Sequence, residues 1–299
     1  EIPENRQFFN KLTVLGCKIY IKEKYEYINK IIRNSDIIQL EWWNHPATFQ
    51  FLCNQNFPQM RLLIWSHVSG LYFPLIPRKL ISISDKFLFT SECSYKSPRI
   101  ANKYKIDKDK INVVSSGTGF NPKYNINKLN KSIPCFGYMG SLNPSKLNTK
   151  FIDYLTSVKI ENFKVHIWSD NTYQETLKEQ CSKVNRPELI KIHGYTNTPE
   201  IILKNINVFI YLLNETHYGT AENVLLEAMS LGAVPIVFNN PAETTIVDHE
   251  INGFVVNNKN EFAETVYRLI ENPMYLHKIS KNAIKKIANN YTSDKMGYD

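Results

Sequence analysis

The feature that most constrains the fold is a series of short apolar runs, each followed by a helical stretch. The run NVFIYLL at 207–213 has no polar alternation, so a strand formed from it is buried on both faces. Strands of this kind that alternate with helices predict a parallel sheet covered by helices on both sides. In the second half such strands are predicted at 133–142, 163–170, 189–196, 207–213, 234–239 and 253–257, with a first helix at 146–158.

The first half of the chain repeats this pattern less completely. Its predicted strands are at 35–42, 60–68, 86–91 and 111–117. The segment that follows, 119–134, is polar and rich in turn residues, which is typical of a linker. The sequence therefore predicts two α/β domains that face a cleft, residues 1–130 and residues 131–285.

The net charge of +8 comes entirely from the first half. Residues 1–130 hold 19 Lys and Arg against 10 Asp and Glu, whereas residues 131–299 hold 17 against 18. The excess indicates an anionic partner, such as a phosphorylated substrate, an acidic lipid surface or nucleic acid, or else a solvated basic surface. No helix-turn-helix, zinc-finger or RNA-binding signature accompanies it, so we do not expect a nucleic acid partner.

The cysteines and the hydropathy bear on the compartment. The five cysteines are scattered, odd in number and without a Cys-x-x-Cys pair, as in proteins with reduced cytosolic thiols. No stretch approaches the about 18 uncharged apolar residues that a membrane-spanning helix needs. The sequence begins with Glu1 rather than Met, so no signal peptide can be read from it. We expect a cytoplasmic location.

A carboxylate in the middle of an apolar helix marks the candidate site. The stretch from Glu222 to Leu231 is predicted to be a buried helix, because its residues are apolar almost all the way round. Asn223, Glu227 and Ser230 form a polar strip on it, since positions three and four apart share a face. The helix N-terminus follows a strand and a loop, where doubly wound sheets bind anionic ligands. Glu227 could accept hydrogen bonds from a diol such as ribose, or pair with a backbone amide or a lysine in the core.

These motifs resemble the donor half of retaining glycosyltransferases with the GT-B fold, family GT4. The resemblance is carried by GYMGSLNPSKLNTKFIDYL (137–155), IKIHGYTNTPEIILKNINVFIYLL (190–213), ENVLLEAMSLGAVPIV (222–237) and NPAETTIVDHEINGFVV (240–256). The end of the chain resembles the family's last helix, which implies that 286–299 returns to the first domain. The implied fold is two Rossmann-like, doubly wound domains facing a cleft, with a shortened N-terminal domain.

The resemblance also implies roles for individual residues. Glu227 matches the second acid of the family's E-x7-E motif, which holds the ribose hydroxyls of a nucleotide sugar. Lys146 matches a lysine that contacts the diphosphate. His67 matches a histidine near the transferred sugar, and Glu222 on the first turn of the helix could serve as the missing acid, so these two are the predicted catalytic residues. Glu243 in the loop 239–244 is a further candidate acid. The other implied donor-binding residues are Gly140, Ser141, Gly194, Tyr195, Gly219, Thr220, Ala221, Asn223 and Val224.

The sequence departs from the family pattern in three places. The family's first acid, which contacts the donor sugar, falls on Gly219, although Glu215 and Glu222 lie nearby. Ser141 stands where the family often has an arginine beside the diphosphate. Only 34 residues precede the predicted strand at 35–42, fewer than in the family. These differences keep open a binding module or partner subunit of the same fold that has lost catalysis.

The expected reaction is the transfer of a hexose from a UDP-sugar or GDP-sugar to a glycan or lipid-linked acceptor with retention, as in polysaccharide biosynthesis. A sugar-nucleotide epimerase or a phosphorylase of the same architecture stays an alternative, because a fold does not fix a reaction. We expect no metal, because Lys146 and the helix N-terminus would stabilise the leaving diphosphate.

A membrane contact is a further expectation. Residues 65–81 combine aromatic residues with Arg78 and Lys79. This composition suits a contact with the inner face of the cytoplasmic membrane, an acceptor-binding loop, or an ordinary loop packed on the core.

Overall fold

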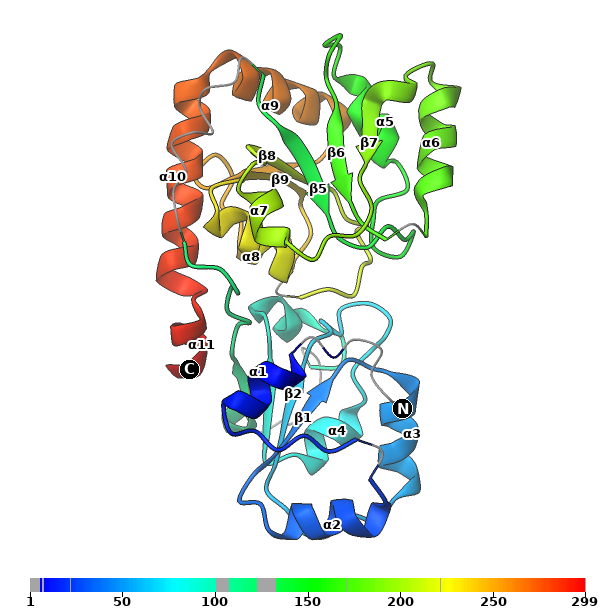
Figure 1. Cartoon of the computed structure of the whole chain (residues 1–299), viewed down its shortest axis with the longest axis vertical. Helices are drawn as coiled ribbons and strands as arrows, with labels where there is room; N and C mark the ends of the chain where they lie inside the picture. Colours follow the sequence, from blue (N-terminus) through cyan, green and yellow to red (C-terminus); the bar gives the residue numbers. More distant parts are fainter. Residues whose placement is uncertain are drawn as a thin grey trace.

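The computed structural model describes residues 6, 8–21, 23–100, 108–122, 133–170, 172–220 and 222–298. Within these residues the chain forms two lobes, each built around its own parallel sheet (Figure 1). The first lobe contains the four strands predicted for the first half of the chain. They form a parallel sheet in the order β1-β2-β3-β4. These strands are β1 (Ile38–Trp42), β2 (Leu62–Ser66), β3 (Lys86–Phe89) and β4 (Ile111–Val113).

The sheet of the second lobe is also parallel and has the order β10-β9-β8-β5-β6-β7. The chain therefore winds outward from β5 in one direction and then from β8 in the other. The point between these two strands is where ligands of doubly wound sheets bind. Every residue of β5, β8 and β9 is buried, as the lack of polar alternation predicts. The strands are β5 (Phe136–Met139), β6 (Val165–Trp168), β7 (Ile190–Ile192), β8 (Val208–Tyr211), β9 (Val234–Phe238) and β10 (Phe254–Val256).

Helices cover both sheets. Local sequence sets several of their starts: His45 and Asn272 each precede a proline at the first helical position, and Asn258 accepts hydrogen bonds from two backbone amides of α9. In the first lobe the helices are α1 (Phe9–Val14), α2 (Tyr25–Arg33), α3 (Pro46–Asn54) and α4 (Arg78–Ile83), with short 3-10 turns at Glu92–Lys96 and Lys108–Lys110. In the second lobe they are α5 (Phe151–Ser157), α6 (Gln174–Lys183), α7 (Pro199–Leu203), α8 (Asn223–Ser230), α9 (Lys259–Glu271) and α10 (Pro273–Asn290), with 3-10 turns at Pro187–Leu189 and Glu243–Thr245. The last helix is α11 (Ser293–Tyr298).

One helix begins later than the sequence pattern predicts. The stretch 146–150 forms turns, and α5 starts at Phe151. The side chains of Asn143 and Asn148 accept hydrogen bonds from the backbone amides of Lys146 and Lys150, each at 2.9 Å. Such side-chain bonds compete with helix formation. As a result Lys146 lies in a loop at the carboxyl end of β5.

Each lobe has its own hydrophobic core, which is much larger in the second lobe. There, α7, α8 and α10 cover one face of the sheet while α5, α6 and α9 cover the other (Figure 1). Close packing requires a glycine in the central strand, because a Cβ at Gly137 would lie 2.5 Å from Ile206 Cδ1.

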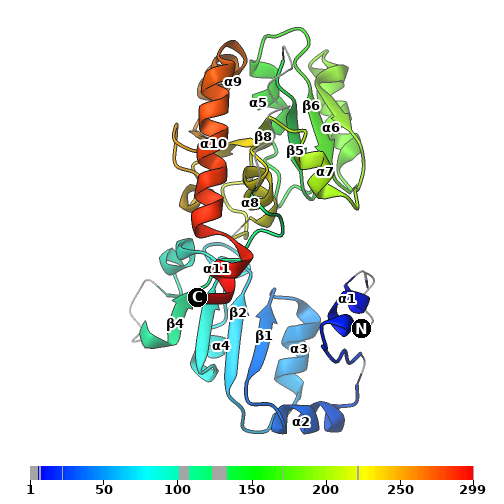
Figure 2. The ribbon, with the colours of Figure 1, turned by 60° about the vertical axis from the view of Figure 1, so that its left-hand side comes forward.

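The C-terminal helices join the two lobes. Figure 2 shows α10 running the length of the second lobe and α11 lying against the first. At the crossing the backbone amide of Thr118 donates to Tyr291 O at 2.8 Å, and the Ser293 hydroxyl donates to Thr118 O at 2.9 Å. The predicted boundary at residue 285 falls inside α10. Most of the predicted linker, residues 123–132, lies outside the described residues.

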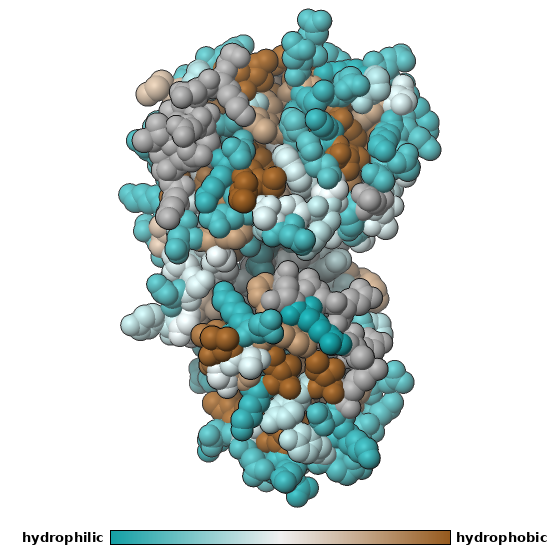
Figure 3. All heavy atoms as spheres, viewed as in Figure 1, coloured by the Kyte–Doolittle hydropathy of each residue, from teal (hydrophilic) through white to brown (hydrophobic). Residues whose placement is uncertain are grey.

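The surface narrows to a waist between the lobes (Figure 3). The loop between β8 and α8 lies at this waist and contacts the first lobe. Ser69 N donates to Tyr218 O at 3.0 Å, and the hydroxyls of Thr90 and Thr220 are 2.5 Å apart. The site at the start of α8 therefore lies between the lobes.

Candidate functional site

The start of α8 has an unusual backbone. Glu222 is its N-cap and has a left-handed conformation, with φ of 43°. This conformation folds the Glu222 side chain back over Gly219, so that a Cβ at position 219 would lie 1.6 Å from Glu222 Oε1. The carboxylate of Glu222 thus fills the space that any side chain at 219 would need.

The Glu222 carboxylate is held by three groups. Lys146 Nζ is 3.1 Å from Oε2, the Tyr211 hydroxyl donates to the same oxygen, and His217 Nδ1 is 3.7 Å from Oε1. The side chain is only 2% exposed. Burial alone would raise the pKa of Glu222, but Lys146, His217 and Tyr211 outweigh burial and lower it. Glu222 is therefore an ionised, fully engaged carboxylate.

His217 extends this network to a second buried acid. Its Nε2 lies 3.0 Å from Oε1 of Glu243 and 3.2 Å from Oε2. Burial alone would lower the pKa of His217, but the hydrogen bond and charge of Glu243 and the charge of Glu222 raise it. Burial also raises the pKa of Glu243. Lys146, Glu222, His217 and Glu243, which we call the buried charge chain, thus alternate between basic and acidic side chains, and neighbouring members lie 3.0–3.7 Å apart.

Glu227 is in a different situation, one helical turn further along α8. Its side chain is half-buried, and no hydrogen bond or ion pair reaches its carboxylate within the residues that the structure describes. Burial alone raises the pKa of Glu227 to about 7. The carboxylate faces the segment between the lobes, 3.5 Å from where a Cβ at Gly119 would lie. The core pairing considered from the sequence is thus absent from the described part of the chain, and the carboxylate is available to a ligand.

The start of α8 offers further donors. Leu225 and Leu226 donate to Glu222 O, whereas the amides of Asn223 and Val224 have no acceptor among the described residues. Free amides at a helix N-terminus attract anions. Thr220 is buried at the waist and bonded to Thr90. Ala221 lies outside the described residues.

The remaining predicted donor residues lie at the carboxyl ends of β5 and β7. Gly140 has a positive φ of 144°, and the Tyr138 hydroxyl donates to Ser141 O at 3.0 Å. Gly194 has a positive φ of 79°, and Tyr195 beside it is 71% exposed. Both pairs thus lie beyond the carboxyl ends of the strands, as Lys146 does, where ligands of doubly wound sheets bind.

His67 belongs to a separate cluster in the first lobe. It follows β2, its ring stacks on Trp43 at 4.2 Å, and its Nε2 lies 2.5 Å from Glu41 Oε2. Both partners come from the carboxyl end of β1, beside the end of β2 that His67 follows. The structure places this cluster on the opposite lobe from the buried charge chain.

Two members of the site escaped the sequence analysis. Tyr211 and His217 both hold Glu222, yet neither stands out by spacing or motif. The only available signal was their position, because Tyr211 ends β8 and His217 lies in the loop that leads from β8 to α8.

Two features of the chain bear on metal ligation. No group of three or more His, Cys, Asp or Glu side chains that could hold a metal ion occurs among the described residues. The sequence does contain one Asp-x-Asp, at 107–109. Asp107 lies outside the described residues, and Asp109 precedes β4, at the end of the sheet away from the waist. None of the helices in the described ranges is both long and apolar enough to cross a bilayer.

Comparison with known proteins decides the family. The family model described as Glycosyl transferases group 1 matches residues 103–286, more than half of the chain. The chain belongs to this family. No curated protein matches it.

Solved structures show the same GT-B fold. The chain is similar to TarM of S. aureus, solved with UDP, at 17% identity and a TM-score of 0.72 over 91% of this chain and 56% of that one. It is similar to HepE of Anabaena, also solved with UDP, at 15% identity and a TM-score of 0.70 over 91% and 79% of the two chains. It is also similar to sucrose-phosphate synthase of Thermosynechococcus elongatus, at 14% identity and a TM-score of 0.71 over 100% of this chain and 78% of that one. The chain therefore spans just over half the length of TarM.

Proposed function

We propose that the protein transfers a hexose from a UDP-sugar or GDP-sugar to a hydroxyl of a glycan or lipid-linked acceptor, with retention and without a metal. The observation that carries this proposal is the half-buried carboxylate of Glu227, which has no partner among the described residues. A desolvated carboxylate without a partner is costly unless a ligand satisfies it. The two adjacent hydroxyls of a ribose supply two donors to one carboxylate.

The diphosphate would bind between Lys146 and the start of α8. An ammonium group has three N–H donors, and Glu222 occupies only part of this capacity. The lysine side chain is 25% exposed, so its remaining donors are open to a phosphate oxygen. Together with the amides of Asn223 and Val224, it would stabilise the negative charge of the departing nucleoside diphosphate.

Glu222 suits a positioning role in this scheme. Its carboxylate is 2% exposed and engaged by Lys146, Tyr211 and His217, so it holds the lysine rather than contacting the sugar. The transferred sugar would lie at the waist between this network and His67 of the first lobe. The UDP-bound structures of TarM and HepE support the choice of a nucleoside diphosphate donor.

Calorimetry with UDP, GDP and their glucose and mannose derivatives tests the donor assignment. We expect one diphosphate to bind, and Glu227→Ala to weaken it about tenfold or more, because hydrogen bonds to a charged group contribute about 1.5–3 kcal/mol each. The matched control is Glu271→Ala, an exposed acid at the end of α9. Equal losses in both variants, or no binding of any nucleotide by the wild type, would overturn the assignment.

Turnover measurements test the remaining parts of the proposal. Retention is checked by the anomeric proton coupling of the product, and an inverted product contradicts it. Metal independence predicts an unchanged rate of UDP or GDP release in excess EDTA. A rate that falls and returns with Mg²⁺ or Mn²⁺ contradicts it.

One observation favours a second candidate, a nucleotide-sugar-binding subunit without activity. Gly219 carries no acid, and the nearest carboxylate is already engaged. This candidate predicts donor binding that depends on Glu227, but no release of the nucleoside diphosphate from any donor sugar. Release of UDP or GDP well above the rate of a Lys146→Ala control excludes it.

A further inference from the structure

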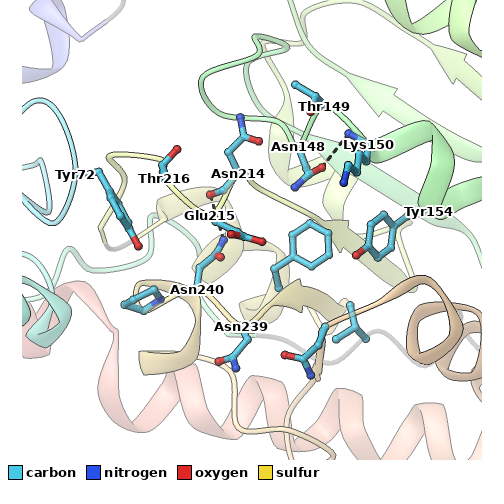
Figure 4. Close-up of a pocket in the computed structure, with 14 residues that line it drawn as sticks. Tyr72, Asn148, Thr149, Lys150, Tyr154, Asn214, Glu215, Thr216, Asn239 and Asn240 are labelled. Atoms are coloured by element: carbon cyan, nitrogen blue, oxygen red, sulfur yellow. Dashed lines mark hydrogen bonds between the residues drawn. The ribbon is translucent and has the colours of Figure 1, made fainter.

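A cavity of about 590 Å³ lies at the carboxyl ends of β8, β9 and β10 (Figure 4). It shares no lining residue with the buried charge chain. Its volume is within the roughly 300–1,000 Å³ of small-molecule sites. The wall between the cavity and Lys146 is the start of the β8–α8 loop, where Asn214 N donates to Lys146 O at 2.8 Å.

The lining of the cavity is rich in amides and nearly neutral. Five of its lining residues are asparagines, and its charged groups are one lysine and one glutamate: Asn148, Asn214, Asn239, Asn240, Asn257, Lys150 and Glu215. A phosphate site would need an excess of positive charge, and a Ca²⁺ or Mg²⁺ site would need several carboxylates. Side-chain amides both donate and accept, which suits ligands with many hydroxyls.

Backbone contacts fix which way two of these amides face. Asn240 is 3% exposed, and its Nδ2 donates to Leu213 O at 3.4 Å and to Asn214 O at 3.3 Å. Its oxygen is therefore left as an acceptor. Asn148 is the converse case, because its Oδ1 accepts from Lys150 N at 2.9 Å and its NH₂ group is left as a donor. The cavity thus presents a fixed acceptor and a fixed donor.

Aromatic groups complete the cavity, and one of them comes from the other lobe. Tyr154 packs edge-on against Phe238, with ring centroids 4.9 Å apart. Tyr72 lies in the 65–81 segment of the first lobe and lines the side facing the waist. Aromatic faces that flank hydrogen-bonding groups suit the apolar and polar faces of a sugar ring.

We propose that this asparagine-lined cavity binds an uncharged saccharide, a unit of the acceptor glycan. The word acceptor rests on the proposed function, whereas the binding itself does not. The segment 65–81, considered from the sequence as an acceptor-binding loop, then acts through Tyr72.

Saturation-transfer NMR with neutral sugars (glucose, galactose, N-acetylglucosamine, maltose and lactose), with and without UDP or GDP, tests this proposal. Asn239→Leu removes an exposed amide that has no hydrogen bond within the described ranges. We expect a neutral sugar to bind the wild type, and this variant to bind it about two- to tenfold more weakly, as one or two hydrogen bonds are lost. The control is Asn56→Leu, an exposed asparagine of the first lobe outside the cavity, which should bind like the wild type.

The outcomes separate this proposal from the donor assignment. If none of these sugars binds, if binding survives Asn239→Leu unchanged, or if glucose 6-phosphate is preferred, the saccharide cavity is refuted. UDP or GDP binding measured on the same samples reports on the proposed function alone. Sugar binding without nucleotide binding would uphold the cavity and overturn the donor site.

Discussion

The reciprocal fit of Gly219 and Glu222 makes a sharp prediction about stability. When Glu222 is present, Gly219→Ala places a methyl group 1.6 Å from Glu222 Oε1 and 2.9 Å from both Glu222 Cδ and His217 Nδ1. The Glu222 carboxylate must then leave Lys146 and Tyr211. In a Glu222→Gly background the carboxylate is gone, and the same substitution meets only His217.

The magnitudes follow from the contacts. Displacing a buried carboxylate from its partners costs about 3–5 kcal/mol, so Gly219→Ala alone should lower the free energy of unfolding by this order. Glu222→Gly loses the same partners but relieves the left-handed backbone at φ 43°, which costs a non-glycine residue about 1–2 kcal/mol. In that background the clash with the carboxylate is absent. Gly219→Ala should then change the free energy of unfolding by no more than about 1 kcal/mol, which is the size of the effect that alanine has by restricting the unfolded chain.

Urea unfolding of the wild type, both single variants and the double variant measures the coupling. We expect a coupling free energy of at least about 2 kcal/mol, with m-values unchanged. Gly232→Ala is a comparison, because its contacts are with Ser280 and Ile284 rather than Glu222, and it should show no coupling with Glu222→Gly. Effects of Gly219→Ala and Glu222→Gly that add within about 0.5 kcal/mol would refute the packing described for this loop.

Four further predictions concern charge. Nucleotide affinity should fall as the pH drops below about 7 and Glu227 becomes protonated, and isothermal titration across pH 5.5–8.5 (about these limits) should show no such fall for Glu227→Gln. Folding raises the pKa of Glu227 to about 7, so the ionised side chain destabilises the folded protein increasingly as pH rises from the pKa of the unfolded chain through about 7. Glu227→Gln should therefore stabilise the protein more at pH 8 than at pH 5 (about these values). Thermal unfolding at both pH values measures this difference. Lys146→Ala should weaken diphosphate binding and lower the free energy of unfolding by about 3 kcal/mol, because it leaves Glu222 buried without its cation. Weaker binding with an unchanged free energy of unfolding would contradict the pairing of Lys146 with Glu222. Association with anionic vesicles should weaken as salt rises, and absent or salt-independent binding in co-sedimentation would exclude contact through the basic first lobe.

The sequence predicted the second sheet well because burial on both faces leaves a simple signal. Runs such as VFIY and VPIVF have no polar face, so their strand character can be read without knowing their neighbours. The start of α5 was predicted too early, because Asn143 and Asn148 turn the chain with side-chain hydrogen bonds that apolar periodicity does not report. Ser141, Gly140, Gly194 and Tyr195 remain predictions as donor contacts.

The buried charge chain was beyond reach of the sequence for a different reason. Lys146, Glu222, His217 and Glu243 come from three loops that meet only when the sheet forms. The left-handed backbone conformation of Glu222 determines the position of its carboxylate. No local sequence pattern predicts this conformation for a glutamate. Family likeness supplied Lys146 and an acid near the site, but not the pairing between them.

The three acids of this region differ in one respect that bears on function. Glu222 and Glu243 are almost wholly buried, yet each is held by cationic or hydrogen-bonding groups of the protein. Glu227 is less buried, but burial raises its pKa to about 7 and nothing among the described residues compensates. Glu227 lies a few residues from these two acids and faces the waist without a partner among the described residues, so it carries a local energetic deficit that ligand binding can remove. A diol can donate two hydrogen bonds to Glu227 only when the carboxylate is ionised, so nucleotide affinity depends on the protonation of this residue. The pH dependence of nucleotide affinity therefore tests the donor assignment directly.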